Sequence, residues 1–276
     1  MSAGDHPDRS GASQVVYIDA SSILTKTAGF LSAYDFSLNP YGGCSFGCTY
    51  CYAAFFGRDQ TRRDTWGQWV DVKQNAVDLL MRKKPGSLDG KIIYLSSVTD
   101  PYQPIERTLQ LTRRLLTILG ERHRAHVVIQ TRSPLVTRDI DVLRTLARVQ
   151  VNMTVTTDDD TVRRVFEPQC AAIHARLAAI TTVAAAGIPS AVTMTPLLPV
   201  ADAEAFAIQL LATGVEHFVV QDFHVTRGNF VAGTRAAALQ LVAARGWDAA
   251  AYQRVVATLR ARIPALTEGK DGFAPR

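Results

Sequence analysis

The chain has 276 residues, of which 47% are hydrophobic and 20% are charged, as is typical of a folded globular protein. This composition excludes disorder throughout, and no apolar run reaches the roughly 20 residues that a membrane-spanning helix needs. The net charge of +5, with a pI near 9.1, fits an anionic partner such as a nucleotide or a nucleic acid but does not require one.

The N-terminal stretch MSAGDHPDRSGASQ is small and polar, and we expect a disordered tail over residues 1–20. They contain no apolar segment of the kind found in secretory signals. Three of the four cysteines crowd into eight residues, which does not resemble a disulfide framework. We therefore expect a cytoplasmic protein with no membrane partner.

From residue 36 onward, strand-like and helix-like segments alternate. The predicted strands are 36–39, 91–98, 125–133, 149–157, 190–198 and 217–223. Apolar residues at helical spacing predict five helices between these strands. The markers of the first four are Val72, Ala76, Leu79 and Leu80; Leu111, Leu115, Ile118 and Leu119; Ile140, Leu143 and Ala147; and Ile173, Leu177, Ile180 and Ala184. Gly187 and Pro189 are expected to end the fourth helix, and the fifth is expected at residues 203–212.

Strict alternation of this kind implies parallel strands, because right-handed crossovers pack the helices against the sheet. Six such units predict an α/β fold, a partial (β/α)6 TIM-like barrel, with its chemistry at the carboxyl ends of the strands. We expect the barrel core to span residues 21–225. A C-terminal helical extension, 226–276, is expected to pack on the barrel, with one helix carrying Trp247, Ala251, Val255 and Leu259.

The segment NPYGGCSFGCTYCY carries the cysteine loop, Cys44, Cys48 and Cys51, in the spacing C-x3-C-x2-C. Such short spacing lets one loop present three thiolates to one face of an iron–sulfur cluster. The glycines free the backbone for positive φ and for a close approach to the inorganic sulfides. Clusters with a full protein shell usually take four cysteines, so three leave one iron without a protein ligand. That iron could bind the amino and carboxylate groups of S-adenosylmethionine (SAM).

These residues resemble the radical SAM superfamily, whose signature is C-x3-C-x-aromatic-C. Tyr50 fills the aromatic position, and the resemblance counts it among the cofactor-binding residues. The superfamily's partial (β/α)6 barrel matches the alternation described above. The wider cysteine segment and the later stretch SSVTDPYQPIE resemble the spore photoproduct lyase branch in particular. The resemblance spans residues 39–223.

The resemblance implies a [4Fe–4S] cluster and SAM as cofactors, and a one-electron reductant such as flavodoxin or ferredoxin as a partner. The implied activity is reductive cleavage of SAM to a 5′-deoxyadenosyl radical, which then abstracts hydrogen from a substrate. In the lyases, a cysteine near the second strand donates hydrogen to the product radical. This chain reads Ser96-Ser97-Val98-Thr99 there, without a cysteine.

The ends of the predicted strands carry further cofactor-binding candidates. The resemblance implies that Thr99 and Asp100 contact the SAM amino group, although Asp100 could simply begin a turn before a proline. Thr131 and Arg132 end the next strand. The arginine could pair with the SAM carboxylate, where the lyases have a lysine, or it could be an ordinary surface residue.

Asn152 and Thr154 alternate along the fourth strand and could face the ribose, but half-exposed strands alternate in the same way. Asp222 and His224 end the sixth strand, either as substrate-binding residues or as a polar pair that closes the barrel. Cys170 is a candidate hydrogen donor, although a buried, inert thiol is the commoner state. We interpret Asp158, Asp159 and Asp160 as the start of a helix.

Three functions remain open. The first is a radical SAM enzyme acting on a small molecule, anionic or nucleotide-like, and the second is a nucleic-acid lesion lyase. The third is a non-catalytic iron–sulfur or zinc-binding module. Zinc prefers four tetrahedral ligands, and the fourth cysteine, Cys170, is distant in the sequence.

Overall fold

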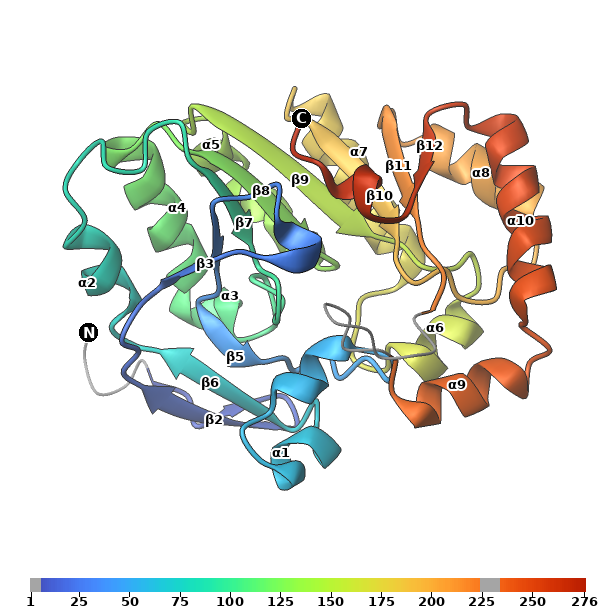
Figure 1. The fold of residues 1–276 in the computed structure, drawn as a ribbon, viewed down its shortest axis with the longest axis horizontal. Coiled ribbons are helices and arrows are strands. Elements are labelled where there is room, and N and C mark those ends of the chain that lie inside the picture. Colours follow the sequence, from blue (N-terminus) through green and yellow to red (C-terminus); the bar gives the residue numbers. More distant parts are fainter. Residues whose placement is uncertain (1–5, 224–233) are drawn as a thin grey trace.

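The computed structural model describes residues 6–223 and 234–276. Its larger sheet has eight strands in the order β12-β11-β10-β9-β8-β7-β4-β3 and curves into a partial barrel (Figure 1). Every neighbouring pair in this sheet is parallel except β3–β4. The strands are β3 (Leu24–Lys26), β4 (Phe36–Leu38), β7 (Ile92–Leu95), β8 (His126–Thr131), β9 (Arg148–Thr154), β10 (Ser190–Met194), β11 (His217–Val220) and β12 (Leu266–Glu268).

The six predicted strands correspond to β4 and β7 to β11, so the expected partial α/β barrel is confirmed. Helices flank the sheet and also lie beyond the ends of its strands (Figure 1). Their bounds are α2 (Ala76–Met81), α3 (Glu106–Leu109), α4 (Leu111–Arg122), α5 (Ile140–Leu143), α6 (Asp160–Phe166), α7 (Ile173–Ala185), α8 (Ala203–Leu211), α9 (Ala236–Ala243) and α10 (Ala249–Arg262).

Strand β8 shows why this sequence forms a covered sheet. Val127 and Ile129 are fully buried in the main core with the helices, whereas Val128 joins a separate cluster with Tyr34 and Tyr94. Successive side chains of a strand point to opposite faces, so both faces of β8 are packed. Near-continuous apolar strands are the expected result of such two-sided burial.

Two of the predicted helices are shorter than expected. Val72 lies in a strand, β6 (Trp69–Lys73), because this segment pairs with residues 14–18 and Val72 itself lies opposite Tyr17. The helix expected through Ala147 ends earlier, since α5 stops at Leu143. Gly187 follows α7 with φ +76°, in agreement with its predicted role at the end of that helix.

The expected disorder of the first 20 residues is wrong for much of that segment. Within it, β1 (Arg9–Ser10) and β2 (Ser13–Ile18) belong to a second, four-stranded sheet with β5 (Tyr41–Gly43) and β6. The small, polar residues end at Gln14, and the apolar, β-prone run VVYI at residues 15–18 pairs in parallel with β6, more than 50 residues later. This sheet supports the segment that carries the cysteine loop, which begins directly after β5.

The C-terminal extension contributes a strand as well as helices, and α10 packs against α8. Strand β12 pairs in parallel with β11 and covers what would otherwise be an open sheet edge. The segment after β12 then turns back across the sheet (Figure 1). The boundary between core and extension at residue 225 stays a prediction. Among the described residues, no helix has the length and apolarity to cross a membrane.

Candidate functional site

A cavity of about 360 Å³ lies at the carboxyl ends of the barrel strands. All three cysteines of the loop line it, together with Tyr50. The other predicted residues that line it are Thr99, Asp100, Thr131, Arg132, Thr154 and Asp222. Asn152 and Cys170 are not among the lining residues, and His224 lies outside the described residues. Residues predicted from several strand ends therefore meet at one place.

Of the three glycines expected to give the cysteine segment positive φ, Gly43 and Gly47 do so, whereas Gly42 does not. Gly43 and Gly47 have φ of +67° and +59°, in the left-handed region that favours glycine. A Cβ atom at Gly43 would lie 2.5 Å from the carbonyl oxygen of Trp69, so no larger residue fits there. Cys44 and Cys48 are buried, Cys51 is half-buried, and all three thiols are free.

Gln103 and Thr99 hold the backbone on both sides of Cys44. The fully buried Gln103 side chain accepts hydrogen bonds from the Ser45 backbone N–H at 2.9 Å and from its hydroxyl at 3.1 Å. The Gln103 amide donates to the Thr99 hydroxyl at 3.2 Å, and that hydroxyl donates to the Gly43 carbonyl at 2.5 Å. The loop after β7 thus fixes where Cys44 points.

If the cysteine loop holds the predicted iron–sulfur cluster, we expect Gln103→Leu to loosen the loop and to speed the loss of iron from the reconstituted protein to a chelator by about tenfold. The reason is that about 1–2 kcal/mol of hydrogen bonding to the loop is removed. Iron release can be followed by absorbance. The matched control is Gln240→Leu on α9, far along the chain from this loop. Equal rates in the Gln103 variant and the wild type would contradict the role given to Gln103.

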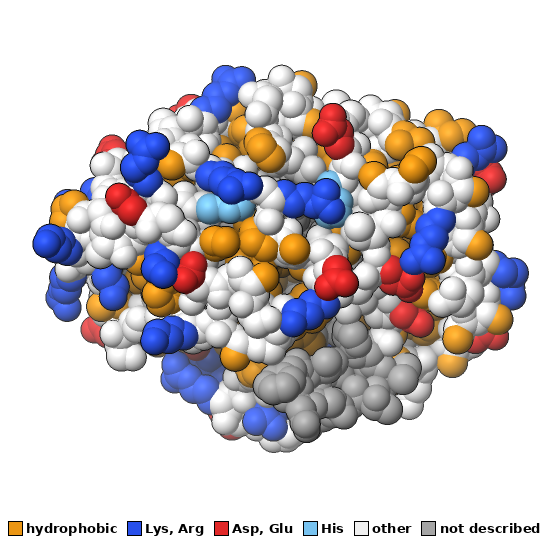
Figure 2. Space-filling model, turned by 45° about the horizontal axis from the view of Figure 1, so that its top comes forward, with side chains coloured by type: hydrophobic (Ala, Val, Ile, Leu, Met, Phe, Trp, Pro, Cys, Tyr) orange, Lys and Arg blue, Asp and Glu red, His pale blue; other side chains and the backbone are white. Residues whose placement is uncertain are grey.

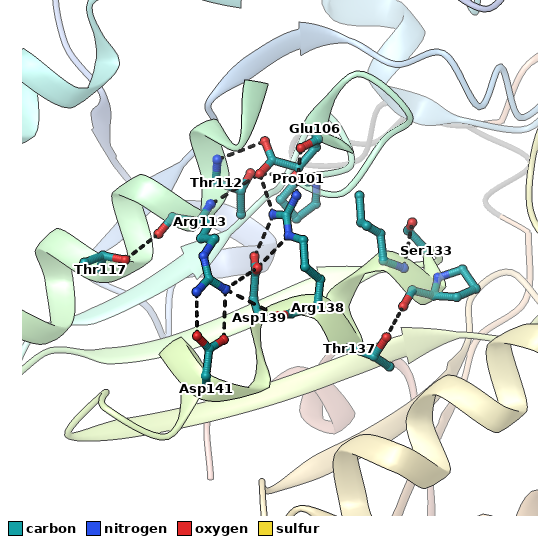
Figure 3. Close-up of polar contacts among 12 residues, drawn as sticks. Pro101, Glu106, Thr112, Arg113, Thr117, Ser133, Thr137, Arg138, Asp139 and Asp141 are labelled. Atoms are coloured by element: carbon teal, nitrogen blue, oxygen red, sulfur yellow. Dashed lines mark hydrogen bonds and ion pairs between the residues drawn. The ribbon is translucent and has the colours of Figure 1, made fainter. Parts of the chain in front are cut away.

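An ionic cluster with buried carboxylates and partly exposed arginines anchors the loop that carries Thr99 and Gln103 (Figure 3). The Glu106 carboxylate accepts from the Thr112 backbone N–H at 3.0 Å, at the start of α4, and from Arg138 at 2.9 Å. Arg138 also pairs with Asp139, which accepts from Arg113 at 2.9 Å. These contacts tie the β7–α4 loop to the 3-10 helix η3 (Pro134–Asp139) that follows β8.

Asp100 joins the end of β7 to the end of β8. Its carboxylate accepts from the Thr131 hydroxyl at 2.7 Å, the Arg132 backbone N–H at 2.9 Å and the Tyr102 backbone N–H at 2.9 Å. The bond from the Tyr102 backbone N–H forms a turn at Asp100-Pro101, as the alternative interpretation of Asp100 predicted. Burial raises the pKa of Asp100, although these hydrogen bonds oppose the shift. Contact of Asp100 or Thr99 with SAM stays a prediction.

Arg132 lies between the cysteine loop and a buried carboxylate. Its Nη1 atom is 2.6 Å from the Tyr50 hydroxyl, 3.0 Å from Glu167 Oε1 and 3.0 Å from Cys48 Sγ. Its guanidinium also lies near the face of the Tyr50 ring, 5.7 Å from the centroid. Arg132 is therefore not the ordinary surface residue of the alternative interpretation.

Glu167 is the hub of this buried network. It is fully buried, and its second oxygen lies 2.5 Å from the equally buried Arg176. The Tyr50 and Thr156 hydroxyls also donate to it. Burial alone would raise its pKa, but the charges of Arg176 and Arg132 and these hydrogen bonds outweigh burial and hold the pKa at about 2. Two arginines and one glutamate leave a net positive charge beside Cys48.

The fold brings Cys170 next to the cysteine loop despite its distance in the sequence. Its sulfur lies 3.7 Å from Cys48 Sγ, behind the cavity lining. The structure therefore gives no support to Cys170 as a hydrogen donor to a molecule in the cavity, and that role stays a prediction. Across the two described ranges, no group of three or more His, Cys, Asp or Glu side chains could hold a metal ion directly. Ligands of a cluster bind different irons, so they need not converge on one point.

The two polar residues predicted on β9 have different surroundings. Thr154 lines the cavity and accepts a hydrogen bond from Gln130 at 2.8 Å. Asn152 is buried and accepts from Gln150 at 2.8 Å. The predicted start of α6 is confirmed, because Asp159 caps that helix through the Thr161 backbone N–H.

Comparison with known protein families identifies the group to which the chain belongs. Residues 38–210, more than half of the chain, match the radical SAM superfamily. The chain belongs to the radical SAM superfamily. The matched region runs from β4 to α8 and includes the cysteine loop, so the predicted fold class, a partial barrel of the radical SAM type, is confirmed.

Curated relatives give no further information on function. An uncharacterized protein of Methanocaldococcus jannaschii is 35% identical over 162 residues, which cover 59% of this chain and 60% of that protein. An uncharacterized protein of Mycobacterium tuberculosis is 29% identical over 212 residues, 72% of this chain and 62% of that protein. The chain thus spans about three fifths of the length of these relatives.

Solved structures of spore photoproduct lyase share the fold. A point mutant of that enzyme has a TM-score of 0.61 and 13% identity, over 92% of this chain and 81% of the lyase. The lyase complexed with dinucleoside spore photoproduct has a TM-score of 0.60 and the same identity and coverage. This likeness confirms the predicted resemblance to the lyases at the level of the fold.

Proposed function

We propose that the chain is a radical SAM enzyme that holds one [4Fe–4S] cluster on Cys44, Cys48 and Cys51. The observation that carries the proposal is that three free cysteines from one loop line the same cavity as Arg132 and Thr154 at the strand ends. The donor set fits the group, because thiolates ligate iron–sulfur clusters and three of them leave one iron for a small molecule.

When held by Cys44, Cys48 and Cys51, the cluster would supply the single electron for reductive cleavage of SAM to methionine and a 5′-deoxyadenosyl radical. The electron comes from an external donor such as flavodoxin or ferredoxin. The protein's own residues bind and orient SAM and exclude water. The barrel core and the C-terminal extension form one catalytic unit around this cavity in our proposal.

Arg132 is the residue best placed to bind the SAM carboxylate. Its bonds to other described side chains all leave from one nitrogen, Nη1, and a guanidinium carries five N–H donors. The carboxylate would gain a charge-assisted hydrogen bond from the side chain that Glu167 and Tyr50 hold in place. Thr154 is the candidate for contact with the ribose, and Thr99 is a candidate for the SAM amino group.

The substrate expected from composition, small and anionic or nucleotide-like, stays a prediction. On the face drawn in Figure 2, Lys and Arg side chains are interspersed with Asp and Glu, which does not favour a nucleic acid over a small molecule. The lesion-lyase alternative gains no specific support either. Among the described residues, only the three cysteines of the loop bring sulfur to the cavity lining.

The proposal is tested by anaerobic reconstitution with iron and sulfide, followed by reduction with dithionite in the presence of SAM. We expect 5′-deoxyadenosine and methionine to form in equal amounts, detected by mass spectrometry. The Cys48→Ala protein serves as the control and should form neither. If the protein carries an intact, reduced cluster and forms no 5′-deoxyadenosine with SAM, the proposed enzymatic activity is refuted. The chain would then be a non-catalytic iron–sulfur module.

A further inference from the structure

One wall of the cavity is built from segments outside the region that matches the superfamily. Phe30 and Leu31, from the 3-10 helix η1 (Gly29–Leu31), line the cavity together with Phe273, from the 3-10 helix η4 (Gly269–Phe273). We call these three residues the aromatic end wall. The Phe30 and Phe273 rings pack edge to face with their centroids 5.3 Å apart.

The position of Phe273 is fixed by its own backbone. Its carbonyl accepts a hydrogen bond from the buried Tyr34 hydroxyl, and the carbonyl of Gly272 lies 3.0 Å from His217 Nε2. A Cβ atom at Gly272 would lie 2.5 Å from a Val219 methyl group, so the segment rests directly on the sheet. The end wall is therefore a built surface of the cavity.

Polar side chains inside the barrel are bonded to one another. Gln130, which lines the cavity, donates to the Thr154 and Thr193 hydroxyls, each at 2.8 Å. Its amide oxygen accepts from the Tyr94 hydroxyl at 3.2 Å. A side-chain amide has two N–H donors, and both are used here. These groups leave little to offer a charged ligand.

Charged side chains of the lining are few and are already engaged. Among the described residues, they are Asp100, Arg132 and Asp222. Asp100 accepts three hydrogen bonds, and Arg132 is bound by Glu167 and, in the proposed function, by the SAM carboxylate. An anionic group beside the end wall would lose its hydration without gaining a cation from the described residues of the lining, which costs free energy.

We propose that the aromatic end wall binds an uncharged, largely apolar group of the substrate, in preference to a phosphate or carboxylate group. This inference rests on the proposed function, which makes the cavity an active site. It also differs from the anionic substrate expected from the net charge of the chain. The specificity of the site would then come from η1 and η4, outside the matched residues 38–210.

The test compares benzamide with benzoate, two probes of nearly the same shape and different charge. Binding to the full-length, reconstituted protein with SAM present is measured by saturation-transfer NMR. We expect benzamide to bind more tightly than benzoate. Phe273→Ala should weaken the binding of benzamide by about tenfold, because it removes an aromatic contact with the probe. Phe30 is half-buried, and Phe30→Ala should weaken the binding by several-fold for the same reason. Phe36→Ala, a half-buried phenylalanine of β4 outside the lining, should bind benzamide like the wild type.

Benzoate binding as tight as benzamide binding, undetectable binding of both probes, or end-wall variants that bind benzamide like the wild type would each overturn the inference. The two proposals can fail separately, because probe binding needs no cleavage of SAM. A wild-type protein that binds benzamide at the end wall but forms no 5′-deoxyadenosine would refute the proposed function and leave the apolar subsite in place.

Discussion

The Glu167→Gln protein should unfold about 10 °C below the wild type. Glu167 and Arg176 are both fully buried, with 2.5 Å between their charged atoms, and Arg132 is the second cation on the same carboxylate. Removing one partner of a buried pair leaves an uncompensated charge, at a cost of about 3–5 kcal/mol. In a chain of this size, each kcal/mol shifts the melting temperature by about 2–4 °C. Thermal melts by circular dichroism measure the shift.

The same substitution at an exposed pair provides the control. Glu204 and Arg262 lie 2.5 Å apart but are each about half exposed, so Glu204→Gln should cost no more than about 1 kcal/mol. The double variant Glu167→Gln with Arg176→Met should recover part of the lost stability, because it removes the buried charge that Glu167→Gln alone leaves unpaired at position 176. Equal melting shifts for the two single Gln variants would show that burial of Glu167 does not matter.

Acidification should narrow the stability gap between the wild type and Glu167→Gln. The folded-state pKa of Glu167, about 2, lies below its ordinary value of 4.5. A depressed carboxyl pKa contributes stability that is full above the unfolded pKa and is lost as the pH falls through 4.5 towards 2. Urea unfolding midpoints of the wild type and Glu167→Gln, measured at about pH 6 and about pH 3, test this expectation. A stability difference between the two proteins that is the same at both pH values would contradict the low pKa of Glu167.

Alanine at Cys44, Cys48 or Cys51 should abolish the cluster, whereas Cys170→Ala should retain it. Loss of one of the three thiolates leaves too few ligands, whereas the Cys170 sulfur contacts Cys48 from behind the cavity lining. Iron and sulfide contents and visible absorption after anaerobic reconstitution measure the outcome. Cys170→Ala is the matched control, because it removes the same atom 3.7 Å from a ligand. If Cys170→Ala also lost its iron, all four cysteines would be ligands.

The barrel could be predicted from the sequence because its signals are local. Each parallel strand is a short apolar run followed by a helix with its own apolar spacing, and the order of such units restricts how they can pair. The second sheet was missed although part of its signal is local. Strand β2 contains the apolar run VVYI, but this run directly follows a small, polar stretch, and its partner β6 lies more than 50 residues later, with Gln14 opposite Trp69.

The cysteine loop could be predicted for the same reason, since its ligands lie within eight residues. The contacts that position this loop could not. Tyr50 and Glu167 are separated by 117 residues, and Ser45 and Gln103 by 58, so only the folded chain brings them together. Gln103 and Glu106 lie in the stretch that resembles the lyases, but nothing in their sequence spacing assigned them to the support of Cys44.

Mössbauer spectroscopy tests the central claim most directly, with the protein reconstituted with the Mössbauer-active isotope of iron. If three cysteines leave one iron open, adding SAM should shift the signal of one iron per cluster and leave the others unchanged. Cys170→Ala, reconstituted in the same way, should show the same SAM-induced shift of one iron. A spectrum that SAM does not alter, with all irons of an intact cluster equivalent, would show a fully ligated cluster and contradict the account.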